Sequence, residues 1–423
     1  MKIAIIGSGS TYTPELIEGL VNRKDNFPVR EIALMDIDDR KLNIVGNLAA
    51  RMVKAGAMDT TVKFTKSLDE ALDGATFVFA QIRVGMLPAR VLDERIPKKH
   101  GLLGQETTGI GGFFKALRTV PVMMQISEAM QRLCPDAFLI NFSNPSGINA
   151  QAILNHTKTK MLGLCNAPLG MISGPQKALG IEGAEMDYIG LNHLSLVTGI
   201  RHGGRDYLRE AVEGNDELLS KLAWGNEQTM EIIRLLEGMP NGYLNHFLYP
   251  KRAWNDTDTT KPTRGEDCIR IEEELLKMFE DESLCHKPEE LSKRGGAMYS
   301  EAAVSLAESI YTGDNKVHVV NCLNAGALDF LANDDAVEVR ASVNKSGATP
   351  VKVVQQGSPL AQNLIQSVKV YERYTVKAAM TGCRTEAIRA LMANPLIQDV
   401  SAAKACFDEL LEAHKQYLPA FFK

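Results

Sequence analysis

The sequence has no hydrophobic run that approaches the length of a membrane span, and its charges are nearly balanced. A helix needs about 20 consecutive apolar residues to cross a bilayer, so no membrane partner is expected. With 47 Lys and Arg against 52 Asp and Glu, the net charge is −5, and a basic surface for nucleic acid is not expected either. The apolar part of the opening MKIAIIGSGS is too short for a secretory signal peptide.

Cysteine is sparse, and no repeat, low-complexity tract or extended linker interrupts the chain. The seven cysteines are scattered and odd in number. This usage favours a reducing compartment over a disulfide framework, so we predict a cytoplasmic protein. At 423 residues the chain exceeds what one hydrophobic core usually serves. We therefore predict two domains that share an interface, residues 1–165 and residues 166–423.

The first 165 residues alternate short apolar runs with helical stretches. Five runs are expected to be buried strands: residues 3–6, 31–36, 75–82, 137–143 and 161–165. Each is short and almost continuously apolar, as strands covered on both faces are. Strands that alternate with helices predict an α/β fold, here a Rossmann-like, doubly wound parallel sheet.

The pattern changes after residue 165. Residues 188–200 and 317–324 have the composition of strands in a second, mixed sheet. Long helices are expected around residues 215–237, 298–311, 359–380 and 401–415. In the third of these, an apolar stripe typical of a packed helix is formed by Leu360, Leu364, Val368 and Tyr371. The second domain is therefore predicted to be a mixed α+β substrate domain.

An incomplete dinucleotide fingerprint follows the first strand. The turn offers four candidate cofactor-binding residues, Gly7, Ser8, Gly9 and Ser10. Tyr12 stands where the fingerprint has its third glycine, but two glycines still permit a tight turn and close approach of backbone N–H groups to a pyrophosphate. Asp36 ends the second strand, where a carboxylate accepts hydrogen bonds from ribose hydroxyls and repels a 2′-phosphate. NAD is therefore favoured over NADP, the alternative being a turn with glycines for steric reasons alone.

A thiol and an imidazole end two apolar segments of the middle of the chain. Cys165 falls where a parallel strand should end, which is where such sheets bind ligands. His193 lies in GLNHLS, beside Asn192. A buried cysteine and an interior histidine are the plain alternatives. The pair alone is not a metal fingerprint by spacing, but an open site completed by substrate oxygens would suit a catalytic divalent ion.

Several long motifs carry a family resemblance. They are NFSNPSG (141–147), GLCNAP (163–168), GLNHLS (190–195), the stretch 82–122, KPEELSKRGGAMYS (287–300) and EAHKQYLPAFF (412–422). Through them the chain resembles glycoside hydrolase family four from end to end. Within that family it is most similar to the bacterial members that act on 6-phospho-β-glucosides. The resemblance implies an architecture like that of lactate and malate dehydrogenases.

The resemblance also implies an unusual route to glycoside cleavage, which departs from the two-carboxylate scheme of most glycosidases. In the family, tightly held NAD+ takes a hydride from C3 of the sugar. The resulting ketone acidifies the proton on C2, which a tyrosine removes, and the glycosidic oxygen then leaves from C1. Water then adds to the resulting enone, and return of the hydride to C3 regenerates the cofactor.

The family's metal ligands and base can be assigned residue by residue. Cys165 and His193 match the ligands of a divalent ion, expected to be Mn2+. Tyr243, in MPNGYL, matches the base that acts at C2. Tyr249 and His246 lie close enough in sequence to compete for that role. A free phenol has a pKa near 10, so the cation must help to lower it.

Four polar residues match positions that contact the substrate. Arg90 and Asn144 match substrate-binding residues, and Arg264 matches an arginine near the phosphate, a group that guanidinium binds well. Asn166 stands where the α-specific members have an aspartate that protonates the leaving group. An amide cannot act as a general acid, so β-glycosides are predicted, and another group or water must protonate the leaving oxygen. Glu106 lies in a matching stretch without an assigned role, as does Asp93.

The expected substrate is a phosphorylated disaccharide or aryl glycoside, and a homodimer or homotetramer is expected from the family. A 6-phospho-β-galactosidase is the alternative within the family, because no motif reads the configuration at C4. From other classes, the alternatives are an NAD-dependent 2-hydroxy acid dehydrogenase and a non-enzymatic NAD-sensing module.

Overall fold

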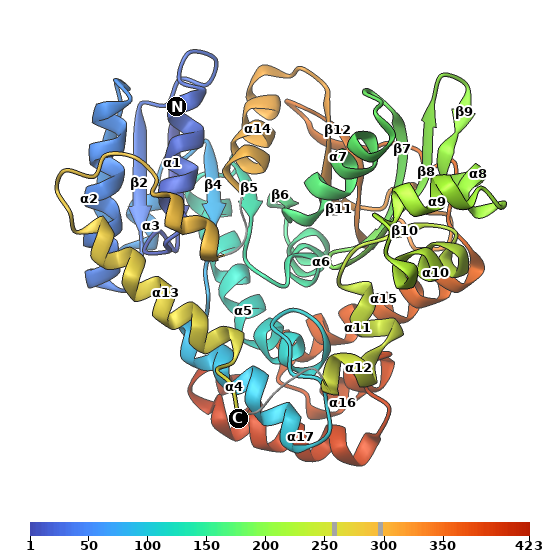
Figure 1. The fold of residues 1–423 in the computed structure, drawn as a ribbon. Coiled ribbons are helices and arrows are strands. Elements are labelled where there is room, and N and C mark those ends of the chain that lie inside the picture. The colour runs from blue at the N-terminus through green and yellow to red at the C-terminus, as the bar shows by residue number, and fades with distance from the viewer. Residues whose placement is uncertain (256–259, 295–298) are drawn as a thin grey trace.

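The computed structural model describes residues 1–255, 260–294 and 299–423 (Figure 1). In these ranges the larger sheet has nine strands in the order β13-β12-β11-β6-β5-β4-β1-β2-β3. A smaller antiparallel sheet has the order β10-β8-β7, with β9 paired to β8. An α/β architecture with a parallel sheet and a second, mixed α+β part was the prediction, and it is confirmed.

The N-terminal half of the larger sheet is parallel throughout. Its strands are β1 (Lys2–Ile6), β2 (Glu31–Met35), β3 (Thr61–Thr65), β4 (Phe77–Ala80), β5 (Phe138–Asn141) and β6 (Lys160–Gly163). The five strands expected from apolar runs are all present. Strands β4 and β5 are buried at every position, because helices cover both faces of a doubly wound sheet.

Helices connect these strands in the alternating pattern that the sequence predicts. They are α1 (Thr13–Asn22), α2 (Asp39–Ala55), α3 (Leu68–Leu72), α4 (Met86–Lys99), α5 (Gly109–Leu133) and α6 (Ser146–His156). The Asp38 side chain caps α2 by accepting a hydrogen bond from the Lys41 backbone N–H. Each crossover helix returns the chain to the end of the sheet where the previous strand began. The carboxyl ends of the parallel strands therefore lie together at the opposite end.

Three strands from the C-terminal half extend this sheet with antiparallel pairing. They are β11 (Lys316–Leu323), β12 (Ala336–Asn344) and β13 (Gly347–Pro350). Strand β11 pairs with β6 where Asn321 lies opposite Gly163. The prediction that residues 317–324 belong to a second sheet was therefore wrong. Strand composition does not reveal which free edge a strand pairs with, and here β11 satisfies the edge of β6.

The smaller sheet consists of β7 (Glu185–Leu191), β8 (Leu194–His202), β9 (Arg205–Asp206) and β10 (Met239–Pro240). The predicted strand over residues 188–200 is in fact a hairpin of β7 and β8, whose turn is Asn192-His193. The chain reverses there through a positive φ of 65° at His193. The hairpin turn thus carries one of the predicted metal ligands.

The remaining helices surround both sheets. They are α7 (Ala167–Leu179), α8 (Tyr207–Val212), α9 (Asp216–Leu222), α10 (Glu227–Leu236), α11 (Leu244–Leu248), α12 (Pro250–Asn255), α13 (Arg264–Phe279), α14 (Tyr299–Thr312), α15 (Pro359–Thr381), α16 (Arg384–Ala393) and α17 (Val400–Ala413), with short 3-10 turns η1 (Glu289–Arg294), η2 (Lys415–Tyr417) and η3 (Pro419–Phe422). Helix α13, yellow in Figure 1, packs against α2 and α4 of the nucleotide half. The two halves therefore share an extensive interface.

Two helix predictions need correction. The helix expected over residues 215–237 is two helices, because Gly225 has a positive φ of 71° and Asn226 caps α10 through its side chain. The apolar stripe of α15 is buried at Val368 and Tyr371, but Leu360 is 51% exposed. The helix expected over 298–311 is α14, and residue 298 itself lies outside the described residues. The others hold.

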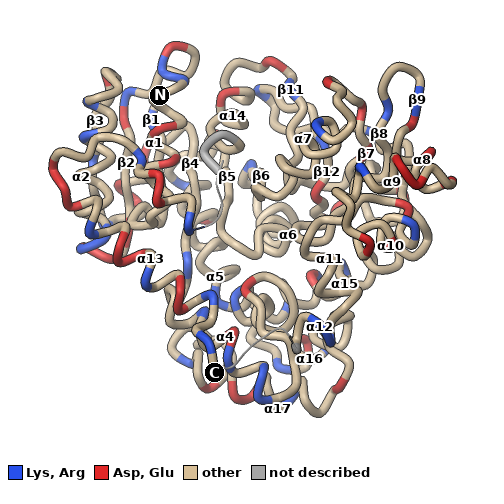
Figure 2. Tube along the Cα trace, viewed as in Figure 1, with Lys and Arg blue, Asp and Glu red and all other residues tan. Residues whose placement is uncertain are grey.

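Charged residues of both signs are spread along both halves of the chain (Figure 2). Within the described ranges, no helix is long and apolar enough to cross a membrane. The domain boundary at residue 165 stays a prediction.

Candidate active site

A cavity of about 860 Å³ lies between the glycine turn, α4, the β7–β8 hairpin turn and the start of α13. Ten of the residues singled out in the sequence line it: Gly7, Gly9, Ser10, Asp36, Arg90, Asn144, Asn166, His193, Tyr243 and Arg264. Two others, Ser8 and Cys165, are buried behind the wall, at 1% and 5% exposure. The structure therefore gathers the predicted cofactor, metal and substrate residues around one space.

The two glycines of the turn stand where a side chain would collide with neighbouring atoms. A Cβ on Gly7, whose φ is +84°, would lie 2.9 Å from the Gln81 carbonyl oxygen. A Cβ on Gly9 would lie 2.9 Å from the Asp36 carboxylate, which accepts a hydrogen bond from the Gly9 N–H at 2.8 Å. The Ser8 hydroxyl is buried without a hydrogen-bond partner among the described residues. A cradle of this kind at the start of α1 fits a dinucleotide.

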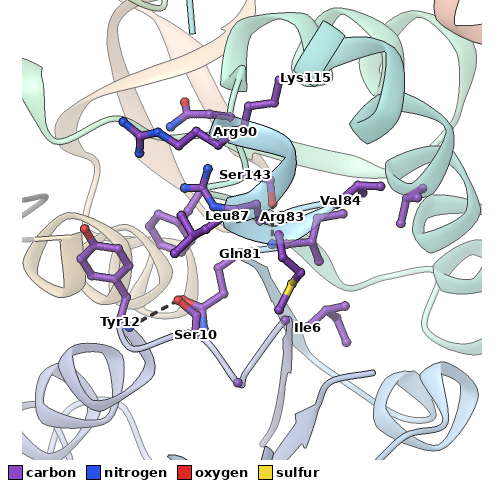
Figure 3. A pocket seen from close by; sticks show the side chains of 18 of the residues that line it. Ile6, Ser10, Tyr12, Gln81, Arg83, Val84, Leu87, Arg90, Lys115 and Ser143 are labelled. Carbon is purple, nitrogen blue, oxygen red and sulfur yellow. Dashed lines mark hydrogen bonds between the residues drawn. The ribbon is translucent and has the colours of Figure 1, made fainter. Parts of the chain in front are cut away.

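Tyr12 replaces the third glycine of the fingerprint without closing the cradle. Its backbone N–H donates to the Ser10 hydroxyl, a contact drawn in Figure 3, and its ring lies below the Arg294 guanidinium at 5.6 Å. Its hydroxyl donates to the Arg294 carbonyl oxygen. Tyr12 thus joins the glycine turn to the η1 segment of the second half.

Cys165 and His193 meet at the opposite end of the cavity. Cys165 lies two residues beyond the end of β6, and its Sγ lies 3.6 Å from Nε2 of His193 in the hairpin turn. Burial lowers the pKa of His193 to about 4, so its imidazole is neutral at pH 7 and free to ligate. Burial and the charge of Glu338 raise the pKa of the Cys165 thiol to about 12. A bound cation must therefore displace the thiol proton.

This donor pair fits a catalytic divalent ion better than a structural one. Among the described residues, no group of three or more His, Cys, Asp and Glu side chains converges in metal-binding geometry. A thiolate and a neutral imidazole therefore leave coordination positions open on the cavity side, where His193 and Asn166 line the wall. Substrate oxygens can occupy such positions.

Tyr243 lies beside the imidazole. Its ring centroid is 4.2 Å from that of His193. Burial, followed by the charges of Cys165 and Glu106, raises its pKa to about 12, and Arg90 opposes this rise. Of its two rivals, Tyr249 donates to Glu231 instead. Of Tyr243, Tyr249 and His246, only Tyr243 lines the cavity.

Glu106 is a site residue whose role the sequence did not reveal. Its carboxylate accepts contacts from Arg83 at 2.6 Å, Lys115 at 2.5 Å and Arg90 at 2.7 Å. Although burial opposes ionisation, these three cations hold the pKa of Glu106 well below its usual range. Arg90 also pairs with Glu94 at 2.7 Å. The three cations belong to one side of the cavity wall (Figure 3), and they favour an anionic ligand.

Lys115 and Arg83 are two site residues that the sequence motifs did not mark. Lys115 is 4% exposed in the middle of an apolar stretch of α5, and burial and the nearby charge of Arg83 lower its pKa. A buried lysine among apolar neighbours was the available signal, since such a charge needs a partner. Arg83 lies in the loop three residues before α4.

The other predicted residues are placed as follows. Asn144 follows β5, directly before the cis-bonded Pro145, at the carboxyl edge of the sheet. Arg264 begins α13, is exposed, and donates to the carbonyl oxygens of Lys293 and Arg294.

Asp93 does not line the cavity. It is buried in α4, where it pairs with Arg118 at 2.6 Å and with His414 at 2.8 Å. These contacts join α4 to α5 and to the C-terminal end, so Asp93 serves packing.

Comparison with known proteins agrees with this geometry. Two family models match the chain, "Family 4 glycosyl hydrolase" over residues 2–181 and "Family 4 glycosyl hydrolase C-terminal domain" over residues 188–397. The chain belongs to family 4 of the glycosyl hydrolases. It is 40% identical over 434 residues to a probable 6-phospho-beta-glucosidase of Bacillus subtilis (strain 168), with 100% of this chain and 98% of the relative covered.

Solved structures show the same likeness. The structure resembles that of the 6-phospho-beta glucosidase from Thermotoga maritima with manganese, NAD+ and glucose-6-phosphate, with a TM-score of 0.89, 33% identity and 99% of each chain covered. Malate dehydrogenase from Plasmodium falciparum gives a TM-score of 0.54 at 14% identity, over 90% of this chain and 98% of the other. The latter concerns the fold alone, and it confirms the predicted dehydrogenase-like architecture.

Proposed function

We propose that this chain is a 6-phospho-β-glucosidase that depends on NAD and a divalent metal, expected to be Mn2+. The observation that carries the proposal is the position of Cys165, His193 and Tyr243 at one end of a cavity whose other end is the glycine turn. The B. subtilis relative and the T. maritima structure support the substrate class and both cofactors.

Each cofactor has a place in the cavity. The turn at Gly7 and Gly9, together with Asp36, would hold NAD+, which would supply the reversible hydride transfer that makes the C2–H bond of the sugar acidic. Cys165 and His193 would hold the divalent ion, which would supply Lewis acidity to the sugar oxygens. Ser8 and Ser10 add hydroxyls on the nucleotide side.

Tyr243 is proposed to take the proton from C2. Its phenol is held beside His193, within the region that the Cys165–His193 pair defines. A phenol with a pKa of about 12 is almost fully protonated at neutral pH and cannot accept a proton, so the local field must favour its ionised form during turnover. Arg90 is one cation whose charge acts in that direction.

The substrate phosphate requires cationic donors, and the cavity has them. Arg90, Asn144 and Arg264 are proposed to bind the sugar phosphate. Arg83 and Lys115 extend the positive wall, and Glu106 and Glu94 offset part of its charge. Guanidinium groups bind phosphate with two parallel hydrogen bonds, which gives orientation as well as affinity.

The anomeric preference is proposed to follow from Asn166, which directly precedes α7 and lines the cavity. An amide there cannot protonate the leaving oxygen. β-Glycosides are therefore the proposed substrates, and the choice between 6-phospho-glucosides and 6-phospho-galactosides is decided by assay.

The test is hydrolysis of p-nitrophenyl β-glucoside 6-phosphate by the purified, reduced protein with Mn2+ and catalytic NAD+. We expect p-nitrophenol release without net NADH accumulation, and little release from the α-anomer. Stoichiometric NADH formation from a 2-hydroxy acid would favour the dehydrogenase instead. NAD binding with no turnover of any glycoside would favour a sensing module. The β-galactoside analogue measures the preference at C4.

Two further expectations accompany this proposal. A cytoplasmic location follows from the free thiol that the metal site requires, and a homodimer or homotetramer follows from the family. Size-exclusion chromatography with light scattering measures the second directly, and a monomer would contradict it.

A further inference from the structure

A buried carboxylate lies behind the metal-binding end of the cavity. Glu338, on β12, is 1% exposed. It accepts hydrogen bonds from the Tyr188 hydroxyl at 2.9 Å, Asn192 Nδ2 at 3.0 Å and Asn321 Nδ2 at 3.4 Å. Its three donors are all neutral, and no salt bridge among the described residues includes it. A carboxylate buried in this way is costly unless a nearby cation compensates it.

One branch of the network fixes the turn that carries the imidazole. Asn192 donates to Glu338 through Nδ2, and its Oδ1 accepts from the Ser146 N–H at 3.2 Å. The amide is therefore held at both ends, next to His193, whose positive φ makes the turn unfavourable by itself. Glu338 thus reaches His193 through the residue that precedes it.

A second branch reaches the phenol. The Tyr188 hydroxyl contacts the Ser195 hydroxyl at 2.7 Å, and Asn241 Nδ2 donates to Ser195 Oγ at 3.2 Å. Asn241 Oδ1 in turn accepts from the Tyr243 backbone N–H at 3.1 Å. The turn that carries Tyr243 is thereby tied to Glu338 through three side chains.

A third contact brings β12 close to the thiol. Asn321 lies opposite Glu338 in the β11–β12 pairing and opposite Gly163 in the β11–β6 pairing. A Cβ on Gly163 would lie 2.9 Å from Asn321 Cβ, so this approach requires glycine. Gly163 precedes Cys165 by two residues. The antiparallel extension of the sheet therefore places Glu338 behind all three reactive groups.

We propose that Glu338 is a positioning residue that sets the geometry of His193 and Tyr243 and places a negative charge behind the divalent ion. The inference rests on the proposed function. An ion held by Cys165 and His193 is the cation that would compensate the Glu338 carboxylate, as carboxylates behind metal ligands do elsewhere. Tyr188 and Asn192 connect Glu338 to the turns that carry Tyr243 and His193.

The test measures Mn2+ binding rather than turnover. Free Mn2+ is followed by electron paramagnetic resonance as it is titrated into the full-length, reduced, NAD-loaded protein. Glu338→Gln keeps an oxygen that accepts from Asn192 but removes the charge. Loss of a partner behind a ligand weakens metal binding by about 10- to 100-fold, and that loss is the expected result.

Asp187→Asn is the matched control. Asp187 is a buried carboxylate on β7, next to Tyr188, and it binds Arg201 at 2.6 Å and the Val354 N–H at 3.1 Å, away from the hairpin turn. The Asp187→Asn substitution should lower the melting temperature and leave the Mn2+ affinity within about threefold of that of the wild-type protein. Equal losses in both variants, or an unchanged affinity in Glu338→Gln, would overturn the inference.

Ser195→Ala tests the second branch in a variant that keeps the Glu338 charge. Because it unlinks Asn241 from Tyr188, we expect a lower kcat with unchanged Mn2+ affinity, and an unchanged kcat would overturn this branch. It also tests the network if Glu338→Gln does not fold. Failure of the wild-type protein to bind Mn2+ would instead contradict the proposed function itself, which separates the two claims.

Discussion

The two ends of the cavity are built in different ways. At the cofactor end, Gly7 and Gly9 follow β1 and Asp36 follows the adjacent β2, so backbone shape and nearby sequence make the site. At the reactive end, Cys165 and His193 come from the larger and the smaller sheet. A binding site built from backbone atoms can be recognised in the sequence from a short motif. A site built from side chains that come from distant strands can be recognised only once the sheet topology is known.

The two ends should therefore fail in different ways. A cradle made by backbone is damaged by added volume, because a single Cβ collides with the atoms that shape the cradle. A site made by side chains is damaged by lost chemistry, even when the volume is unchanged.

The largest effect is expected from Cys165→Ser. A serine hydroxyl is a poor ligand for the divalent ion at neutral pH, so the metal-dependent rate should be abolished while the fold and NAD binding persist. Activity with Mn2+ and the circular dichroism spectrum measure both. Cys406→Ser, at a buried cysteine of α17, is the control and should keep full activity. Full activity in Cys165→Ser would remove this residue from the site.

Tyr243→Phe should lower kcat by about 10²- to 10⁴-fold, the usual range for loss of a general base. The ring still packs against His193, so Mn2+ and NAD+ affinities should stay within a few fold of wild type. Steady-state kinetics and binding titrations measure the difference. Tyr249→Phe removes a hydroxyl that contacts Glu231 instead, and it should remain active. A large loss of kcat in Tyr249→Phe with little loss in Tyr243→Phe would instead assign the role of the base to Tyr249.

Gly9→Ala should weaken NAD+ binding by about tenfold, because an added methyl in a filled space costs about 1–3 kcal/mol. The new Cβ would lie 2.8 Å from Lys41 Cβ and 2.9 Å from the Asp36 carboxylate. Gly170→Ala is the control, since nothing lies within 4 Å of a Cβ there. Calorimetric titration of NAD+ measures both. Equal affinities in the two variants would mean that the turn does not hold the dinucleotide.

The smallest effect concerns pH. The pKa of His193 is lowered from 6.5 to about 4 in the folded state, so the unfolded chain binds more protons between these values. The metal-free protein should therefore lose stability as the pH falls from 6.5 towards 4. His193→Asn should lose less over the same range, which urea unfolding at pH 7 and pH 5 measures. Identical losses would contradict a buried neutral imidazole.

Much of the fold follows from local patterns, and the two exceptions have different causes. Strands β1, β2, β4, β5 and β6 are short apolar runs between helices, and a parallel sheet is the arrangement that buries them. Strand β11 has the same composition, but its partner β6 lies some 150 residues earlier, and nothing in either segment specifies the pairing. The break between α9 and α10 depends on Gly225 and Asn226, a local signal that the helical pattern concealed.

The site divides in the same way. The glycine turn and Asp36 are readable because they are consecutive with their strands. Cys165 is marked by its place at a strand end, and Tyr243 was found through the family resemblance. Glu338 has no such marker, because its function arises only when β12 pairs antiparallel with β11, opposite Asn321. Partners across antiparallel strands are set by register, which the sequence alone does not display.

The central claim is that both ends of the cavity act on one sugar, so that oxidation at C3 makes the C2 proton available to Tyr243. Hydrolysis of p-nitrophenyl β-glucoside 6-phosphate in heavy water, followed by proton magnetic resonance of the released glucose 6-phosphate, tests it most directly. The account predicts deuterium at C2 of the product. Complete hydrolysis with hydrogen retained at C2 would contradict it.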